Sequence, residues 1–374
     1  DQIRASAKHY WKGWARSHDD PGSQLSSSIN DEYWRSLLTI RTQIDNHGGI
    51  LAANDSDIMQ FNRDTYTYVW PRDGAFVSLA LTHCGQSEAV TRFLDFCARV
   101  QTKEGYLLHK YNPDGSAGSS WHPWYMNGQS VLPIQEDETA LPLVALWRHF
   151  ERFQDIEFLH NMFQRFAGKA ADFLVRYREE ETGLPLPSYD LWEEHQGIFS
   201  FTSAATCAGL RAASSIASAL GHYRHADRYK EAYSSMKNAI LTHLYDEEST
   251  CFLKKIRREG GITSERDTTP DASIATLWMF GLLPPDDPRM VSTIHRLQEA
   301  LAVRTPVGGY ARYSNDYYQS VTPPTAEVPG NPWIITTLWF AEWQIATASK
   351  IEDLEKPRAL LQWVCDHASV AGML

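Results

Sequence analysis

The chain has 374 residues, of which 43% are hydrophobic and 22% are charged, so it can bury one large core or two smaller ones. This composition excludes disorder as its main state. Lysine and arginine total 35 against 46 aspartate and glutamate residues, which leaves a net charge of −11. A nucleic acid or an anionic membrane surface would require a basic face, so we expect neither as a partner. No apolar stretch reaches the roughly 18 residues of a membrane-spanning helix.

Apolar residues at helix-like spacing predict a helix that begins near Asn30 and ten more helices along the chain. We place these ten at 71–84, 86–102, 135–153, 156–180, 200–220, 222–245, 270–283, 286–302, 331–349 and 354–370. Little strand is expected beyond a hairpin around 246–256.

Every second helix of this series follows a long loop that is rich in aromatic, acidic, proline or glycine residues. The five loops are 66–73, 121–138, 189–197, 268–271 and 308–333. Helix pairs that repeat in this way, about every 65 residues, stack into a solenoid or close into a ring. Loops of variable length that carry most of the chemistry at one end favour the ring. We therefore predict an all-α fold, an (α/α)6 barrel with about eleven of its twelve helices present.

Two adjacent glutamates, Glu193 and Glu194, follow Trp192 in a loop before a predicted helix. An aromatic neighbour and a second carboxylate both favour the protonated form of a carboxylic acid, so one of the pair could serve as a general acid. The alternative is that both are surface residues that complement the dipole of the following helix. Spacing alone leaves both interpretations open.

A second candidate site surrounds Pro71, which begins a predicted helix with Arg72 and Asp73 in its first turn. An arginine at a helix N-terminus opposes the dipole and therefore needs a partner. A charged pair beside aromatic rings, here Tyr66 and Trp70, is typical of a pyranose site, because the charges bind hydroxyls and the rings cover the apolar faces of the sugar. The alternative is a structural ion pair among core aromatics.

Three other segments carry polar residues at predicted helix starts or on their loops. Gln135–Thr139 opens an apolar helix, and we favour a capping and dipole role over direct catalysis. Thr268–Asp271 is expected only to start a helix. A second arginine, Arg312, stands with Tyr313 on the loop that leads to Trp333, and supplies another charged group beside aromatic rings.

Metal and nucleotide chemistry have no support in the sequence. The fourteen histidines give no HExxH or paired ligand spacing, and we expect His109, His122 and His195 to pack or hydrogen-bond rather than bind metal. The GxSxG, GxGxxG and GKS-type motifs are absent, which leaves serine hydrolase and nucleotide-binding functions unsupported. We therefore expect no metal site and no cofactor.

Five motifs occur in the order seen in glucoamylases, glycoside hydrolase family fifteen, and the chain resembles that family over nearly its whole length. The motifs are Trp70–Asp73, Gln135–Thr139, Asp190–Glu194, Ala311–Tyr313 and Gly330–Trp333. The resemblance implies the (α/α)6 barrel and removal of glucose from the non-reducing ends of α-glucans with inversion. One glutamate acts as acid and another as base in such a reaction, and no cofactor is required.

The resemblance also implies a role for each matching residue. Glu193, by its place in the Trp-Glu-Glu motif, is the expected general acid, and Glu194 is its substrate-binding neighbour. The other residues expected to line the terminal-glucose pocket are Tyr66, Trp70, Arg72, Asp73, Trp192, Arg312, Tyr313 and Trp333.

The chain departs from the family at the second carboxylate. The family's base lies in a Pro-Glu-Gln segment just before the last inner helix, and residues 360–374 resemble what precedes that segment, so we expect the general base to be missing. Glu327, on a different loop, is the nearest upstream candidate for a substitute. We divide the chain into a linker-like segment, 1–28, and a catalytic domain, 29–374, that is incomplete at its C-terminus. The N-terminal β-sandwich domain that bacterial relatives often carry is expected to be missing as well.

Together these expectations describe an exo-acting inverting hydrolase of α-1,4 and possibly α-1,6 glucans, weakly active or inactive as this chain alone. The alternative from another class is a non-catalytic carbohydrate-binding or regulatory module on the same fold. Within the enzyme class, trehalase and glucodextranase are the alternatives, because loop shapes set the linkage preference. The sequence indicates no cellular compartment and no oligomeric state.

Overall fold

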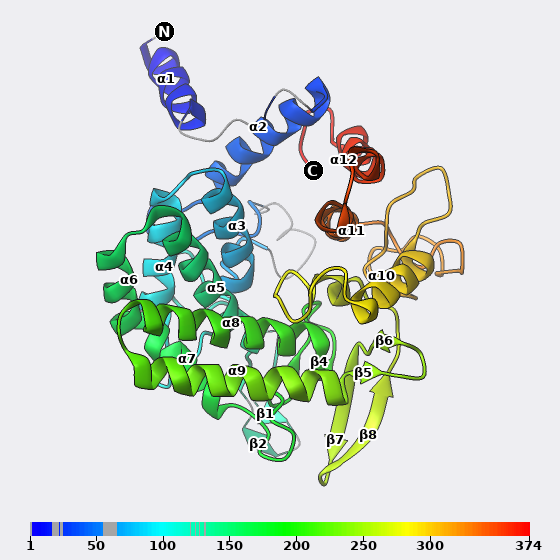
Figure 1. Ribbon diagram of the computed structural model, residues 1–374. Helices are drawn as coiled ribbons and strands as arrows, with labels where there is room; N and C mark the ends of the chain where they lie inside the picture. Colours follow the sequence, from blue (N-terminus) through cyan, green and yellow to red (C-terminus); the bar gives the residue numbers. More distant parts are fainter. Residues whose placement is uncertain are drawn as a thin grey trace. The chain divides into compact units, whose positions relative to one another are not determined.

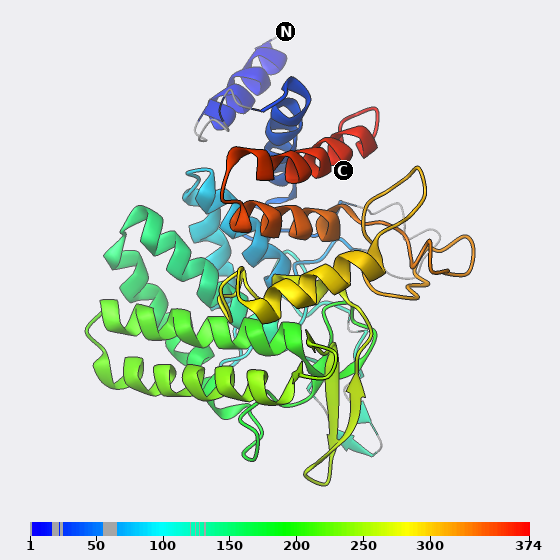
Figure 2. The same cartoon turned by 45° about the vertical axis from the view of Figure 1, so that its right-hand side comes forward.

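The computed structural model describes residues 2–16, 22, 25–54, 66–119, 121–123, 125–126, 128–130 and 132–374. The chain forms two compact units. The first comprises Asp1–Arg178 and Ala208–Tyr233, and the second comprises Glu179–Cys207 and Ser234–Leu374. Figures 1 and 2 show the elements of both units from two directions.

Helices make up most of the first unit (Figure 1). Its elements are α1 (Gln2–Arg16), α2 (Ser27–Gln43), α3 (Pro71–His83), α4 (Glu88–Val100), α5 (Glu136–Phe153), α6 (Ile156–Met162), a π-helical turn (Phe163–Ala167), α7 (Gly168–Arg176) and the short strands β1 (Tyr125–Met126) and β2 (Gln129–Ser130). Two longer helices, α8 (Ser200–Ala219) and α9 (Tyr223–His243), contribute one part to each unit. Helix α3 packs against both α4 and α5, so the first turns of α3 and α5 are neighbours.

Capping residues explain where the helices of the first unit begin. The Asp155 side chain accepts a hydrogen bond from the backbone N–H of Phe158 at 2.9 Å, and α6 begins at the predicted residue. Pro71 occupies the first turn of α3, where its missing N–H leaves no donor unsatisfied, and this start is also as predicted. Helix α2 begins at Ser27 rather than near Asn30, because the side chain of Ser26 provides the cap.

The helix predicted over 156–180 is interrupted and shorter. Helix α6 gives way to the π-helical turn at Phe163, and α7 begins at Gly168, whose backbone N–H donates to the carbonyl oxygen of Phe163. The helix ends at Arg176. A π-turn adds a residue to one turn and shifts the side chains that follow, which an apolar pattern averaged over the whole segment does not reveal.

The second unit combines helices with small antiparallel sheets. Its strands are β3 (Ser188–Tyr189), β4 (Gln196–Phe199), β5 (Tyr245–Asp246), β6 (Cys251–Phe252), β7 (Lys255–Glu259) and β8 (Ile262–Asp267), and its remaining elements are a 3-10 turn (Ala272–Thr276), α10 (Pro288–Leu301), α11 (Ile334–Thr347), a second 3-10 turn (Ile351–Leu354) and α12 (Glu355–His367). Four strands form one sheet in the order β3-β4-β7-β8, and β5 pairs with β6.

The four-stranded sheet places the Asp190–Glu194 segment. Strands β3 and β4 pair with Tyr189 opposite Gln196, so the residues between them form the connecting loop. Strand β4 continues the sheet onto β7, with Ile198 opposite Ile256. The predicted hairpin around 246–256 is confirmed in part, because β5 and β6 fall there, whereas β3, β4 and the β7–β8 hairpin were not predicted.

The helix predicted over 270–283 is wrong. A 3-10 turn covers only Ala272–Thr276, and turns follow it. The backbone at the start of this segment hydrogen-bonds to another loop instead of forming helical hydrogen bonds. The N–H of Ala272 donates to the carbonyl oxygen of Arg312, and Asp271 pairs with Tyr313 in an isolated β-bridge. A similar bridge between Ala311 and Pro332 delays α11 until Ile334, three residues after the predicted start.

The predicted linker-like segment 1–28 contains α1, and residues 17–21 and 23–24 within it lie outside the described residues. The division at residue 28 stays a prediction, since the two compact units divide the chain at other places. In the described ranges, no helix combines the length and the apolar character needed to cross a membrane.

Helices α8 and α5 approach closely at Gly209, so a larger residue there should lower the stability of the protein. A Cβ atom on Gly209 of α8 would lie 2.9 Å from both the Cβ and the carbonyl oxygen of Ala140 on α5, closer than backbone can tolerate. We expect Gly209→Ala to lower the free energy of unfolding by about 1–3 kcal/mol. Gly13→Ala is the control, because Gly13 lies in exposed α1 with nothing within 4 Å, and it should leave stability unchanged or raise it by up to about 1 kcal/mol. Urea unfolding of both variants measures the difference, and equal effects would contradict the packing argument.

Candidate active site

Arg72 lies buried in the first turn of α3, and the first turn of α5 supplies its partners. Its Nη1 atom is 2.9 Å from Asp137 Oδ2 and 2.9 Å from Glu138 Oε1, and it also donates to the side-chain oxygen of Gln135. The backbone N–H of Arg72 donates to the other oxygen of Glu138. The arginine at this helix start therefore has the partners that the sequence required.

The acidic partners of Arg72 are fully buried, which makes the cation indispensable. Burial raises the pKa of Glu138 well above its ordinary range; the positive charge of Arg72 acts in the opposite direction, and the negative charge of Asp137 adds to the rise. Asp73 lies at the edge, with its side chain 43% exposed and its Oδ2 atom 3.6 Å from Arg72 Nε. The expected side-chain cap at Gln135 is wrong, because the Gln135 amide binds Arg72 and His122 instead of the helix backbone.

Three aromatic rings surround a buried lysine beside this cluster, and a fourth ring packs against two of them. The Nζ atom of Lys110 is 3.5 Å from the ring centroid of Trp121, 4.4 Å from that of Tyr68 and 5.2 Å from that of Trp70. Tyr66 stacks on Trp70 at 6.0 Å and meets Trp121 edge to face at 5.8 Å. Since Tyr66 and Trp121 are 41% and 40% exposed, the rings present an open apolar face.

Two buried histidines lie behind these groups. The rings of His109 and His122 are 4.5 Å apart, and Nε2 of His122 is 3.0 Å from the side-chain nitrogen of Gln135. Burial lowers the pKa of His122 to about 3, and the nearby positive charges of His109, Arg72 and Lys110 add to the effect. His122 is therefore neutral at neutral pH, and it hydrogen-bonds as the sequence led us to expect.

In the second unit, the acidic pair lies in the tight loop between β3 and β4. The carbonyl oxygen of Asp190 accepts the backbone N–H of Glu193 at 2.9 Å, and its Oδ1 atom accepts the N–H groups of Glu194 and His195 at 2.8 and 2.9 Å. Glu193 has φ of +63°, a left-handed conformation that costs a non-glycine residue about 1 kcal/mol. The Asp190 side chain stabilises the turn that imposes this conformation.

Glu194 is held by two side chains from the loop after α10. Its Oε2 atom accepts the hydroxyl of Tyr313 at 2.5 Å, and its Oε1 atom is 3.3 Å from Arg312 Nη2. Arg312 also forms a two-point pair with Asp316, with distances of 2.7 and 2.8 Å. This geometry contradicts the surface-dipole alternative for Glu194, which is largely buried and is separated from α8 by strand β4.

Aromatic rings enclose the Arg312 guanidinium. Its central carbon lies 4.8–5.2 Å from the ring centroids of Trp192, Tyr313, Tyr318 and Trp333. Burial alone would lower the pKa of Arg312, but the hydrogen bonds and charge of Asp316 and the charge of Glu194 raise it above its ordinary value. The guanidinium is therefore a permanent positive charge in a largely dry setting.

A buried ion pair anchors Trp192. Its indole N–H donates to Asp271 Oδ2 at 3.0 Å, and Lys254 Nζ is 3.0 Å from the same oxygen. Asp271 also caps the 3-10 turn through the N–H and hydroxyl of Ser273. Thr268–Asp271 was expected only to start a helix; it leads instead into a 3-10 turn, and Asp271 also binds Trp192.

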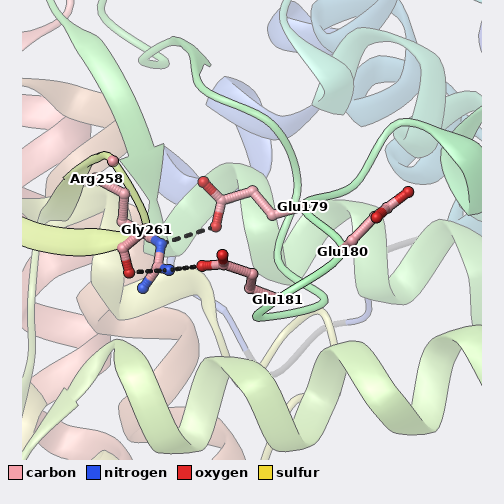
Figure 3. A pocket seen from close by; sticks show the side chains of 6 residues that line it. Glu179, Glu180, Glu181, Arg258 and Gly261 are labelled. Atoms are coloured by element: carbon pink, nitrogen blue, oxygen red, sulfur yellow. Dashed lines mark hydrogen bonds and ion pairs between the residues drawn. The ribbon is translucent and has the colours of Figure 1, made fainter.

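A separate acidic pocket of the second unit contains none of the predicted site residues (Figure 3). It is lined by Glu179, Glu180, Glu181, Arg258, Gly260 and Gly261. Arg258 lies 3.0 Å from a Glu179 oxygen and 2.7 Å from a Glu181 oxygen, so two of the three carboxylates share its single positive charge.

The structure thus forms two clusters, one in each unit. The first-unit cluster contains the predicted residues Tyr66, Trp70, Arg72 and Asp73, and the second-unit cluster contains Trp192, Glu193, Glu194, Arg312, Tyr313 and Trp333. Sequence reasoning missed Lys110, Trp121, Lys254 and Asp271 as members. Trp121 had a usable signal, its place in an aromatic-rich loop, whereas Lys254 lies in a short basic run that gives no sign of burial.

Replacing Arg72 by a neutral residue should lower the free energy of unfolding, because its charge stabilises two buried carboxylates. We expect Arg72→Met to lower the free energy of unfolding by about 3–5 kcal/mol, because Asp137 and Glu138 would stay buried without their partner. Arg92→Met is the matched control, since the Arg92–Glu88 pair is exposed on both sides and should contribute less than about 1 kcal/mol. Denaturant unfolding at neutral pH compares them, and a small effect at Arg72 would show that the carboxylates are not charged.

The low pKa of His122 couples stability to pH. Between pH 6.5 and about 3, the unfolded chain binds a proton at this residue and the folded chain does not. The free energy of unfolding therefore falls as pH falls, by about 1.4 kcal/mol per unit inside that window. We expect His122→Gln to lose this part of the slope between pH 6 and 4, measured by urea unfolding. An unchanged slope would mean that His122 is protonated in the folded protein.

Comparison with known proteins identifies the family. The model of glycosyl hydrolases family 15 matches residues 28–360. An uncharacterised glycosyl hydrolase of Methanocaldococcus jannaschii is 29% identical over 98% of this chain and 55% of its own length. A glucoamylase of Clostridium sp. is 24% identical over 85% of this chain and 44% of its own, and trehalase 2 of Sulfolobus acidocaldarius is 24% identical over 90% and 57%. The chain spans about half the length of these curated relatives.

The fold has solved counterparts. A bacterial glucoamylase crystallised with acarbose superposes with a TM-score of 0.72 at 19% identity, over 97% of this chain and 53% of that one. At this level of identity the likeness concerns the fold, and it confirms the predicted all-α (α/α)6 barrel with about eleven of its twelve helices. Since the family model covers most of its residues, the chain belongs to glycosyl hydrolases family 15.

Proposed function

We propose that this chain carries the catalytic acid of an exo-acting, inverting glycosidase that releases glucose from the non-reducing ends of α-glucans. The observation that carries the proposal is the turn between β3 and β4, where Asp190 holds Glu193 in a strained conformation next to a fixed Glu194. Backbone strain that the surroundings maintain is concentrated at functional sites. Membership of a glycoside hydrolase family supports the reaction class.

Glu193 is the general acid in this proposal. A carboxylic acid at this position protonates the glycosidic oxygen as the bond to the anomeric carbon breaks, while a second carboxylate takes a proton from the attacking water. The water adds to the opposite face of the sugar, so the released glucose has the β configuration. The Asp190 turn supports this role because it holds the Glu193 backbone in one conformation.

The groups around Glu194 are suited to bind sugar hydroxyls. Glu194 and Arg312 present a carboxylate and a guanidinium 3.3 Å apart among aromatic rings, an arrangement that hydrogen-bonds adjacent hydroxyls and covers apolar sugar faces. Their mutual contacts pre-organise both charges before substrate binds. In the first unit, we propose that Arg72 and Asp73, with Trp70 and the exposed ring of Tyr66, bind sugar in the same way.

The second carboxylate of the proposed reaction is the general base, and a substitution experiment is needed to identify it. Inverting glycosidases separate the two carboxyl groups by about 6.5–9.5 Å to admit a water molecule. Glu327 is the candidate that the described residues offer for the base; its side chain is exposed, and its carbonyl oxygen accepts the N–H of Arg304. Glu327→Gln should lower turnover only if this carboxylate activates the water.

Trehalose is the second candidate substrate, because a trehalase and a glucoamylase are equally identical to this chain at 24%. Maltotriose, isomaltose and trehalose, compared at equal concentration, separate the three linkages. Binding of one of them without any turnover would favour the non-catalytic module instead.

The acid role makes a sharp prediction for Glu193→Gln. We expect release of glucose from maltotriose to fall about 10²–10⁴-fold, because the leaving oxygen is no longer protonated. Turnover of α-glucosyl fluoride should survive much better, since fluoride leaves without a proton. NMR of the fresh product should show β-glucose from the parent chain.

Glu248→Gln, an exposed glutamate of the same unit, is the control and should behave as the parent. Added azide distinguishes a missing base from a missing acid, because azide can attack the anomeric carbon of α-glucosyl fluoride without deprotonation. Equal loss on both substrates in Glu193→Gln, despite normal folding, would rule out the acid assignment.

A further inference from the structure

A chain of three buried side chains links His122 to Arg72 in the first unit. Arg72 Nη1 donates to the side-chain oxygen of Gln135, and the side-chain nitrogen of Gln135 is 3.0 Å from Nε2 of His122. All three residues are at most 5% exposed. His122 lies in the loop before α5, Gln135 immediately precedes that helix, and Arg72 lies on α3.

The direction of every hydrogen bond in this chain follows from the chemistry of its two ends. A guanidinium only donates, so the group of Gln135 that faces Arg72 must be its carbonyl oxygen. The amide nitrogen of Gln135, which has only hydrogens to offer, then faces His122. Nε2 of His122 must therefore accept, and the ring proton of the neutral imidazole must reside on Nδ1.

The surroundings of His122 favour the same state. The ring of His109 lies against it at 4.5 Å, and the positive charges of Arg72 and Lys110 act on it together with burial. All of these groups oppose a further positive charge. A protonated His122 would also point a second donor at the amide nitrogen of Gln135 and break the chain.

We propose that His122, as the neutral tautomer protonated on Nδ1, is a positioning residue for sugar binding. By accepting from Gln135 it fixes the amide so that the oxygen faces Arg72, and it thereby restrains the guanidinium through a neutral partner. Asp137 and Glu138 supply the negative charge that balances the guanidinium at Nη1. The His122–Gln135 pair is neutral and only orients the guanidinium. The role in sugar binding rests on the assignment of Arg72 in the proposed function; the tautomer does not.

The first experiment reads the tautomer directly. In protein labelled with ¹⁵N-histidine, two-bond ¹H–¹⁵N spectra distinguish an imidazole protonated on Nδ1 from one protonated on Nε2, and the spectrum of His122→Gln assigns the signals. We expect His122 to carry its proton on Nδ1 and to remain neutral from pH 7 to 5. A proton on Nε2, or titration near pH 6.5, would overturn the proposal whether or not the chain has activity.

The second experiment tests positioning through affinity for maltose and trehalose, measured by calorimetry. His122→Phe preserves a ring against His109 but removes the acceptor, and we expect about a tenfold weaker affinity. His122→Gln can place an oxygen where Nε2 lies, and should restore affinity to within about threefold of the parent. Gln135→Glu keeps an acceptor for Arg72 but no longer donates, so the His122 signal should change to the doubly protonated form.

The matched control is His149→Phe, another buried histidine of the first unit, whose Nε2 atom is bonded to the Ser87 hydroxyl at 2.8 Å. It should destabilise the fold to a similar extent and leave the affinity unchanged. If His122→Phe and His149→Phe weaken affinity equally, His122 is only structural and the proposal fails. If the parent binds neither sugar while the Nδ1 tautomer is observed, the proposed function fails and the hydrogen-bond chain stands.

Discussion

The need to neutralise buried carboxylates dominates both units of this protein. Asp137 and Glu138 are inaccessible to solvent and lie against Arg72, while in the second unit Asp316 and Asp271 lie against Arg312 and Lys254. The Arg72 pairs join two helix starts, the Lys254–Asp271 pair joins segments on either side of the β7–β8 hairpin, and the Arg312–Asp316 pair closes part of one loop. Because a buried charge without its partner costs several kcal/mol, these contacts determine how helix starts and loops approach one another.

The small sheets of the second unit have a role that a purely helical barrel would not provide. Strands β3 and β4 hold the ends of a six-residue loop in register, and Asp190 closes that loop with its backbone and side chain. Glu193 adopts its left-handed backbone conformation inside this loop.

Aromatic residues serve two purposes in the two clusters. Around Lys110 and Arg312 the rings replace water on the faces of the cations, which lowers the cost of burying them. Tyr66 and Trp121 keep part of their rings exposed, so the same cluster offers an apolar surface. One set of side chains therefore packs around a buried cation and also exposes an apolar face, which is why composition alone could not separate the core interpretation from the binding one.

The sequence by itself determined the helical architecture and the family, because apolar periodicity and short motifs are local properties that survive without coordinates. It also identified Arg72 as an arginine in need of partners and Glu193–Glu194 as a carboxylate pair. Only the tertiary structure decided that the pair lies in a strand-to-strand turn, that 270–283 is not a helix, and that Lys254, Asp271 and His122 belong to the clusters. Most of these features depend on hydrogen bonds and ion pairs between residues 13 to 79 positions apart, and no local pattern encodes such partners.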